Sequence, residues 1–290
     1  MLAALLLQGC ASTDPGSTPI ALKDMLAVNA ELTDSAGKLF RLRSIDDEAH
    51  GPLMSSLEAQ ATATLADLLT ATEMVLFYAH GTDRDAALQY LSRLRDVYDV
   101  LDRRGDATDA QAIGVYQGYV AVRDLAAAGQ LRDSRPFLRE FVLPTLRTSD
   151  DFDASLPATL SLEADGAFSA RNVGLAKGNR VIAVVGCPLS QDLVEAVTRD
   201  PELASQLRDA NILWVVSADR LDAAMVRAWN HRFPDQPLAV AYENTAWAPV
   251  DFDSMPDVFF LRDGKRVASV GGWDPDATLG KLRDALAELR

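Results

Sequence analysis

The residues that most constrain this chain run from 180 to 190 and read R-V-I-A-V-V-G-C-P-L-S. The apolar, mostly β-branched run at 181–185 is typical of a central strand that is buried on both faces, and Gly186 ends it. Cys187 then occupies the position of a helix N-cap, and Pro188 takes the first helical position, where its missing N–H costs nothing. We therefore predict a buried strand that delivers a cysteine to the start of a helix.

This position has a chemical consequence for the sulfur. The unpaired N–H groups and the positive end of the dipole at a helix N-terminus favour a thiolate over a thiol. The nearest downstream charges, Asp192 and Glu195, act in the opposite sense if they lie in the first helical turn. An alternative also stands on these residues: Cys187 is a small buried side chain that only fills the turn.

Length and composition predict two domains. The chain has 290 residues, of which 48% are hydrophobic and 24% charged, as in ordinary globular proteins. Its formal net charge of −14 makes nucleic acid and anionic membrane surfaces poor partners for the body of the protein. We expect a signal and tether at 1–19, a helical domain at 20–150 and an α/β domain at 151–290.

The first half reads as helices joined by short glycine-containing connections, which makes neighbours antiparallel. Apolar residues at helical spacing predict helices at 20–30, 53–79, 82–105, 108–129 and 137–143. The aromatic side chains of this half are expected in its core. His50 and His80 lie near helix breaks without cysteine or histidine partners at metal-ligand spacing, so surface positions and no metal are expected.

The second half alternates strands and helices, which predicts a mostly parallel central sheet with flanking helices. Strands are expected at 159–163, 168–173, 181–185, 211–217 and 237–242, with helices between the last three. After them, Met255-Pro256 precedes a predicted hairpin whose turn reads R-D-G-K at 262–265, and a helix closes the chain.

This order of elements, with C-P-L-S after a buried strand and a proline before the hairpin, resembles the thioredoxin fold over residues 158–290. The additional helix and strand between Ser217 and Tyr242 resemble the TlpA-like and peroxiredoxin-like branch. The resemblance implies that Cys187 is an exposed nucleophile and that Pro256 is a cis-proline packed against it.

The same resemblance implies roles for the neighbouring residues. Ser190 stands where dithiol members carry a resolving cysteine, and its hydroxyl is expected to donate a hydrogen bond to the sulfur. Pro188 and Met255 are expected to contact substrate, Met255 through backbone hydrogen bonds to an extended peptide. Peroxiredoxins place Ser or Thr three residues before their cysteine, whereas this chain has Val184, which disfavours a peroxidase.

With one thiol in the motif, a mixed disulfide must be released by an external thiol. The sequence therefore predicts exchange with protein thiols or disulfides, of the isomerase or reductase type, without a cofactor. A redox-silent scaffold or assembly protein that binds a partner is the alternative. His231 and Glu243 are candidate proton-transfer groups, for which surface positions are expected.

Near the N-terminus, Leu7-Gln8-Gly9-Cys10 follows an apolar run and resembles a bacterial lipobox. The resemblance implies that Cys10 is lipidated and anchors the chain to a membrane of the cell envelope, facing the periplasm. Ala11 is not the aspartate of the enterobacterial sorting pattern, and the outer membrane is favoured over the inner one. The apolar run is short and lacks a preceding Lys or Arg, so a chance cysteine is the alternative.

Overall fold

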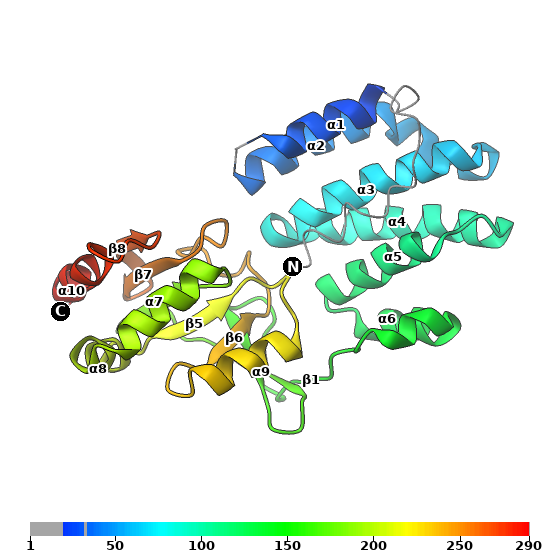
Figure 1. Ribbon diagram of the computed structural model, residues 1–290. Coiled ribbons are helices and arrows are strands. Elements are labelled where there is room, and N and C mark those ends of the chain that lie inside the picture. The colour runs from blue at the N-terminus through cyan, green and yellow to red at the C-terminus, as the bar shows by residue number, and fades with distance from the viewer. Residues whose placement is uncertain (1–19, 32–33, 290) are drawn as a thin grey trace. The chain divides into compact units, whose positions relative to one another are not determined.

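The computed structural model describes residues 20–31 and 34–289, which form two compact units divided between Leu143 and Pro144 (Figure 1). The expected lipidation site Cys10 and the tether lie outside the described residues. The division falls before the predicted residue 150 because β1 (Leu146–Arg147) pairs with β3 (Phe168–Asn172) of the second unit. No helix in the described ranges is both long and apolar enough to cross a membrane.

The first unit is helical. Its elements are α1 (Ile20–Ala30), α2 (Ser35–Ala49), the 3-10 helix η2 (Gly51–Ala59), α3 (Thr62–Thr82), α4 (Arg84–Arg104), α5 (Asp109–Ala121), α6 (Leu125–Ser134) and the 3-10 helix η3 (Pro136–Glu140). Helix α4 is capped by Asp83, which accepts a hydrogen bond from the Ala86 N–H, and ends at Gly105 in the left-handed conformation. Apolar faces of α1 to α5 form one core around Leu65, Leu94 and Leu101.

Two predictions for this half were wrong in detail. The expected helix at 53–79 is split, because Gly51–Ala59 forms 3-10 turns and α3 starts only at Thr62. The expected helix at 108–129 is also split: α5 ends at Ala121, and Asp124 caps α6 by accepting from the Ala127 N–H.

His50 is buried rather than at the surface, which corrects its expected position. Its Nδ1 lies 2.9 Å from Asp46 Oδ1, and Arg93 donates to the other oxygen of Asp46 at 3.1 Å. Tyr90 and Arg93 of α4 also reach Asp47, at 3.2 and 2.9 Å. This network ties α2 to α4 and pairs a carboxylate that would otherwise be costly to bury.

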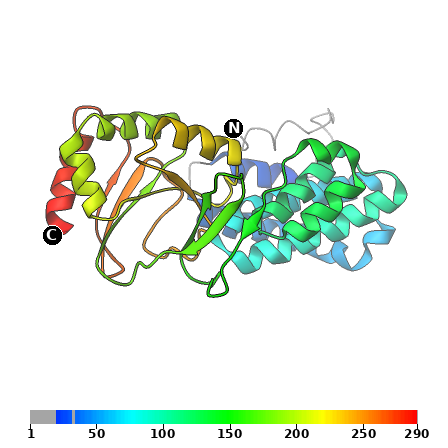
Figure 2. The ribbon, with the colours of Figure 1, turned by 90° about the horizontal axis from the view of Figure 1, so that it is seen from below.

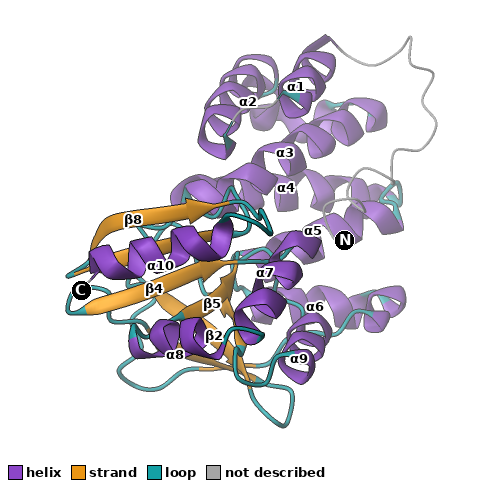
Figure 3. Ribbon diagram, turned by 60° about the vertical axis from the view of Figure 1, so that its left-hand side comes forward, coloured by secondary structure: helices purple, strands orange, loops and turns teal. Residues whose placement is uncertain are grey.

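The second unit is built on one eight-stranded sheet with the order β1-β3-β2-β6-β5-β4-β7-β8 (Figure 3). Besides β1 and β3, its strands are β2 (Ala158–Leu162), β4 (Asn179–Val184), β5 (Leu213–Val216), β6 (Leu238–Ala241), β7 (Asp257–Arg262) and β8 (Lys265–Gly271). The centre, β4-β5-β6, is parallel, and the hairpins β2-β3 and β7-β8 flank it. This order, with helices between the central strands, confirms the predicted thioredoxin-like class.

The two faces of the sheet are covered differently. The helices α7 (Pro188–Thr198), α8 (Pro201–Asp209), α9 (Ala223–Arg232) and α10 (Thr278–Leu289) pack their apolar side chains on a core with one set of strand residues. Figure 2 shows α7, α8 and α9 along one side of the sheet. The other set of strand residues packs against irregular chain that includes the fully buried Trp247 and the buried Val250. Residues 242–256, between β6 and β7, therefore contribute to the core and are not a free loop.

Candidate functional site

The predicted strand, turn and helix are present at the cysteine. The chain is fully buried from Val181 to Val185, and Gly186 follows with a φ of 142°, which side chains rarely tolerate. A Cβ on Gly186 would also lie 3.2 Å from Met255 Sδ. Cys187 is the N-cap of α7, and its side chain is half-buried. The sulfur is therefore held at a helix N-terminus, in a residue that is partly exposed.

Ser190 organises this turn through its hydroxyl. The Ser190 Oγ accepts hydrogen bonds from the backbone N–H of Gly186 at 3.1 Å and of Cys187 at 3.3 Å. It also lies 3.3 Å from Cys187 Sγ, so its own proton can point to the sulfur. Ser190 is fully buried, which means that these contacts hold the hydroxyl in one place beneath Cys187.

Met255 and Pro256 lie directly before β7, on the side of the cysteine. The Met255–Pro256 peptide bond is cis, and Cys187 Sγ lies 3.4 Å from the Met255 carbonyl oxygen. The register explains this meeting: β7 runs antiparallel to β4 and pairs Asp257 with Val184, so its first residues lie where β4 ends. Four of the five site residues predicted in this domain thus gather here: Cys187, Ser190, Met255 and Pro256.

The fifth, Pro188, is exposed at the first position of α7, beside Leu189, whose exposed fraction is 49%. An exposed leucine next to a half-buried sulfur gives the site an apolar rim. A rim of this kind can contact an apolar group on a substrate without requiring any hydrogen bond.

The segment before Met255 is fixed by buried polar contacts. Asn244 accepts from the Ala218 N–H at 2.9 Å and donates to Ser217 Oγ at 2.8 Å, which joins the ends of β5 and β6. Trp247 is fully buried and packs edge-on against Phe252. These contacts hold the chain that leads to Met255.

The two candidate proton-transfer groups fall in different places. Glu243 is buried, with an exposed fraction of 8%, and accepts from the Thr245 hydroxyl, so its expected surface position was wrong. It lies just after β6, where the chain turns inward to cover the sheet. His231, near the end of α9, is exposed as expected.

Arg220 is the residue of this site that the sequence did not reveal. It follows β5, and its Nη1 donates to the Gly186 carbonyl oxygen at 2.9 Å. Its Cδ and Nη1 would both lie 3.6 Å from a Cβ on Gly186. Strand β5 lies next to β4 in the sheet, and this adjacency brings Arg220 to the residue before Cys187 although the two are far apart in the sequence.

The acidic residues near the cysteine do not lie in the first turn of α7. That turn holds no acidic side chain, and Asp192 is exposed in the turn that follows. Glu195 is paired with Arg199 at 2.9 Å and also contacts Arg232. The expected conflict between these carboxylates and a negative sulfur is therefore reduced.

Asp257, directly after Pro256, is a partly buried carboxyl at the start of β7. Burial raises its pKa, and the negative charge of Asp251 raises this pKa further. One of its oxygens, Oδ1, is buried without a hydrogen-bond partner among the described residues.

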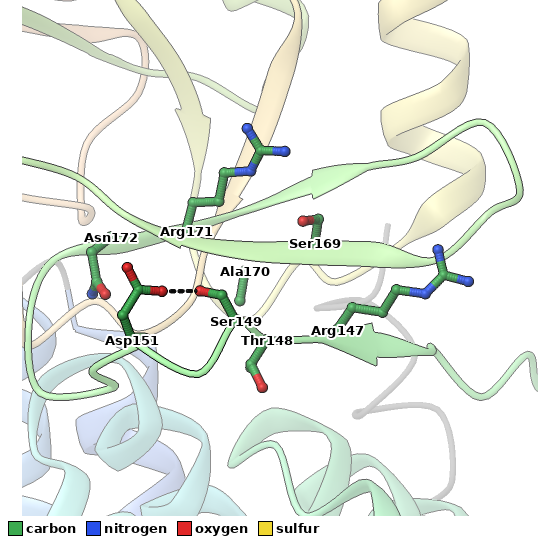
Figure 4. A pocket seen from close by; sticks show the side chains of 8 residues that line it. All are labelled: Arg147, Thr148, Ser149, Asp151, Ser169, Ala170, Arg171 and Asn172. Atoms are coloured by element: carbon green, nitrogen blue, oxygen red, sulfur yellow. Dashed lines mark hydrogen bonds between the residues drawn. The ribbon is translucent and has the colours of Figure 1, made fainter.

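A separate pocket of about 490 Å³ lies at the other end of the sheet, along β1 and β3. Figure 4 shows Arg147, Ser169 and Arg171 around it, with Ser149 hydrogen-bonded to Asp151 at 2.5 Å. Arg147 is paired with Asp165 at 2.6 Å, and none of the predicted site residues lines this pocket.

Comparisons with known proteins give structural neighbours only. No protein-family model matches the chain, and no curated protein does. A thioredoxin-like protein from Bacteroides caccae aligns over 96% of both chains at 13% identity, with a TM-score of 0.31. A thioredoxin-like protein from Porphyromonas gingivalis covers 48% of this chain and 95% of its own, at 16% identity and a TM-score of 0.32.

A secreted disulfide oxidoreductase from Mycobacterium tuberculosis aligns over 48% of this chain and 98% of its own, at 15% identity and a TM-score of 0.33.

Proposed function

We propose that this protein performs thiol–disulfide exchange through the single thiol of Cys187. The Cys187 sulfur, as thiolate, attacks one sulfur of a substrate disulfide and forms a mixed disulfide with it. The substrate S–S bond breaks, and its second sulfur leaves with the electron pair and takes a proton from water. Cys187 is oxidised in this step, and the departing substrate sulfur is reduced.

One observation carries this proposal: the sulfur of the partly exposed Cys187, at the N-cap of α7, lies 3.3 Å from the buried Ser190 hydroxyl. The helix N-terminus stabilises negative charge on the sulfur, and the Ser190 hydroxyl can donate to it. The Met255 backbone, at the start of β7, offers polar groups to an extended substrate.

The second half of the reaction requires a thiol from outside the motif. Ser190 cannot attack the mixed disulfide, so an external thiol forms a disulfide with the substrate sulfur and expels Cys187 as thiolate. The proposed partners are therefore protein disulfides together with a protein or small-molecule thiol. The proposed reaction class is isomerisation or reduction that an external thiol completes.

The test measures mixed-disulfide formation in a full chain carrying Cys10→Ser, which leaves Cys187 as the single thiol. We expect the native protein to gain one hydroxyethyl-thiol adduct from 2-hydroxyethyl disulfide, seen by intact mass and removed by dithiothreitol. Adding Cys187→Ser should abolish the adduct. If the native protein stays unmodified while its urea-unfolded form reacts, the exchange reaction is contradicted. The alternative of a redox-silent scaffold would then remain.

We also propose that Cys10 is lipidated and places the protein in the cell envelope, facing the periplasm. The support is the lipobox-like Leu7-Gln8-Gly9-Cys10 and the Ser/Thr/Pro/Gly-rich stretch that follows it. An oxidising periplasm would supply disulfide substrates to Cys187.

A further inference from the structure

Arg220 is a cationic side chain next to the residue that precedes Cys187, and it has no carboxylate partner among residues 20–31 and 34–289. Several arginines of the second unit are paired with carboxylates: Arg147, Arg199, Arg232 and Arg283. Arg220 forms no ion pair with the described residues, and its side-chain hydrogen bond there goes to the Gly186 carbonyl oxygen. Among the arginines of the second unit, Arg220 is distinguished by its place next to the residue that precedes Cys187.

The position of this guanidinium is fixed beside the nucleophile. Nη1 lies 2.9 Å from the Gly186 oxygen, and Gly186 is bonded directly to Cys187. Arg220 is half-buried, and its backbone N–H donates to the Ser217 carbonyl oxygen at 3.0 Å, which anchors the turn after β5. One edge of the guanidinium is thus held by a carbonyl, which leaves its other N–H groups for a ligand.

We infer that Arg220 is a specificity-determining residue that selects disulfides carrying a carboxylate close to the sulfur. This inference rests on the proposed exchange reaction of Cys187. When the Cys187 thiolate attacks such a disulfide, the carboxylate of the incoming half lies within reach of Arg220 as the new S–S bond forms. The leaving sulfur departs with the electron pair and takes a proton from water.

The experiment compares three disulfides with the same two-carbon spacing between sulfur and end group: 3,3′-dithiodipropionate, 2-hydroxyethyl disulfide and cystamine. Each is reacted with the full chain carrying Cys10→Ser, and the rate of adduct formation is followed by intact mass. The quantity compared is the rate with the anionic disulfide divided by the rate with the neutral one. This ratio cancels any effect of Arg220 on the reactivity of the sulfur itself.

We expect Arg220→Gln to lower this ratio by about fivefold at low ionic strength, which corresponds to the roughly 1 kcal/mol of a solvated charge pair at about 4 Å. The rate with cystamine divided by the rate with the neutral disulfide should instead rise in Arg220→Gln, because cystamine is cationic. Arg220→Lys should keep most of the preference, and salt at about 1 M should weaken it in the chain that retains Arg220. The matched control is Arg208→Gln, which removes the same charge from an exposed position on α8. This variant should leave the ratio unchanged.

An equal ratio in Arg220→Gln and in the chain that retains Arg220 would overturn the inference while leaving the exchange reaction intact. Failure of all three disulfides to react with the native chain, when the unfolded chain does react, would instead refute the proposed function.

Discussion

At the scale of single residues, Ser190 separates this site from a dithiol site. Its Oγ occupies the position at which a second sulfur would face Cys187, with 3.3 Å between the two atoms. In the proposed exchange reaction, the need for an external thiol therefore depends on the identity of this one atom.

Ser190→Cys is expected to form an intramolecular disulfide with Cys187 upon mild oxidation, because the two side chains already face each other across one helical turn. The measurement is intact mass after alkylation, which should show no added label in the oxidised variant and two labels after reduction. The Ser190→Cys variant and its control, Ser190→Ala, are both made in the Cys10→Ser chain. Two labels before reduction would contradict the expected geometry.

Glu73 on α3 is a second residue with a measurable consequence. Burial raises its pKa to about 8, and Gly114 on α5 leaves the space for its carboxyl, since a Cβ there would lie 1.9 Å from Oε1. The folded state therefore binds the carboxyl proton of Glu73 more tightly than the unfolded chain does. The contribution of protonated Glu73 to stability is therefore fully present below about pH 4.5 and is lost as the pH rises towards 8.

We expect Glu73→Gln to raise the thermal midpoint at about pH 9 and to change it little at about pH 4, because the amide stays neutral across this range. Thermal unfolding followed by circular dichroism at both pH values is the measurement. The exposed Glu48 on α2 provides the control Glu48→Gln, for which no pH-dependent difference is expected. Equal shifts at both pH values would contradict the assigned protonation.

At the scale of elements, the segment between β6 and β7 determines where Met255 lies. Trp247→Ala is expected to destabilise the protein by about 3–5 kcal/mol, as large-to-small substitutions in cores do. Urea unfolding measures this loss. Trp247→Phe, which keeps an aromatic ring, should cost less. A loss no larger than for an exposed site would mean that Trp247 does not anchor this segment.

The elements whose signal is local could be predicted from the sequence. The buried run at 181–185 and the Asp-Gly turn of the last hairpin indicated β4 and β7-β8 directly. Helix α2 was missed, because glycine and several charged side chains interrupt its apolar pattern in S-A-G-K-L-F-R-L-R-S-I-D-D-E-A. Arg220 was missed for another reason: only the adjacency of β5 and β4 brings it close to Cys187, and that adjacency is not a local property.

At the scale of the whole molecule, the chain combines a helical unit and a sheet unit, each with its own core. Cys187 lies in the sheet unit, and Cys10 lies in the part of the chain that is not described. The proposed anchor and the proposed chemistry are therefore separable by substitution.

Cys10→Ser is expected to move the protein from the membrane fraction to the soluble fraction of bacterial cells, because the lipid could not be attached. Immunoblotting of the two fractions measures this shift. Cys187→Ser serves as the control and should remain with the membranes. An unchanged distribution of Cys10→Ser would refute the lipid anchor without affecting the site at Cys187.

The central claim is that the Cys187 sulfur is an accessible and activated nucleophile. Its most direct test is the rate of alkylation by iodoacetamide at about pH 7, measured in the Cys10→Ser chain both native and unfolded in urea. The account predicts faster alkylation in the native chain, because the N-terminus of α7 and the Ser190 hydroxyl are proposed to stabilise negative charge on the sulfur. Native alkylation slower than in the unfolded chain would contradict it.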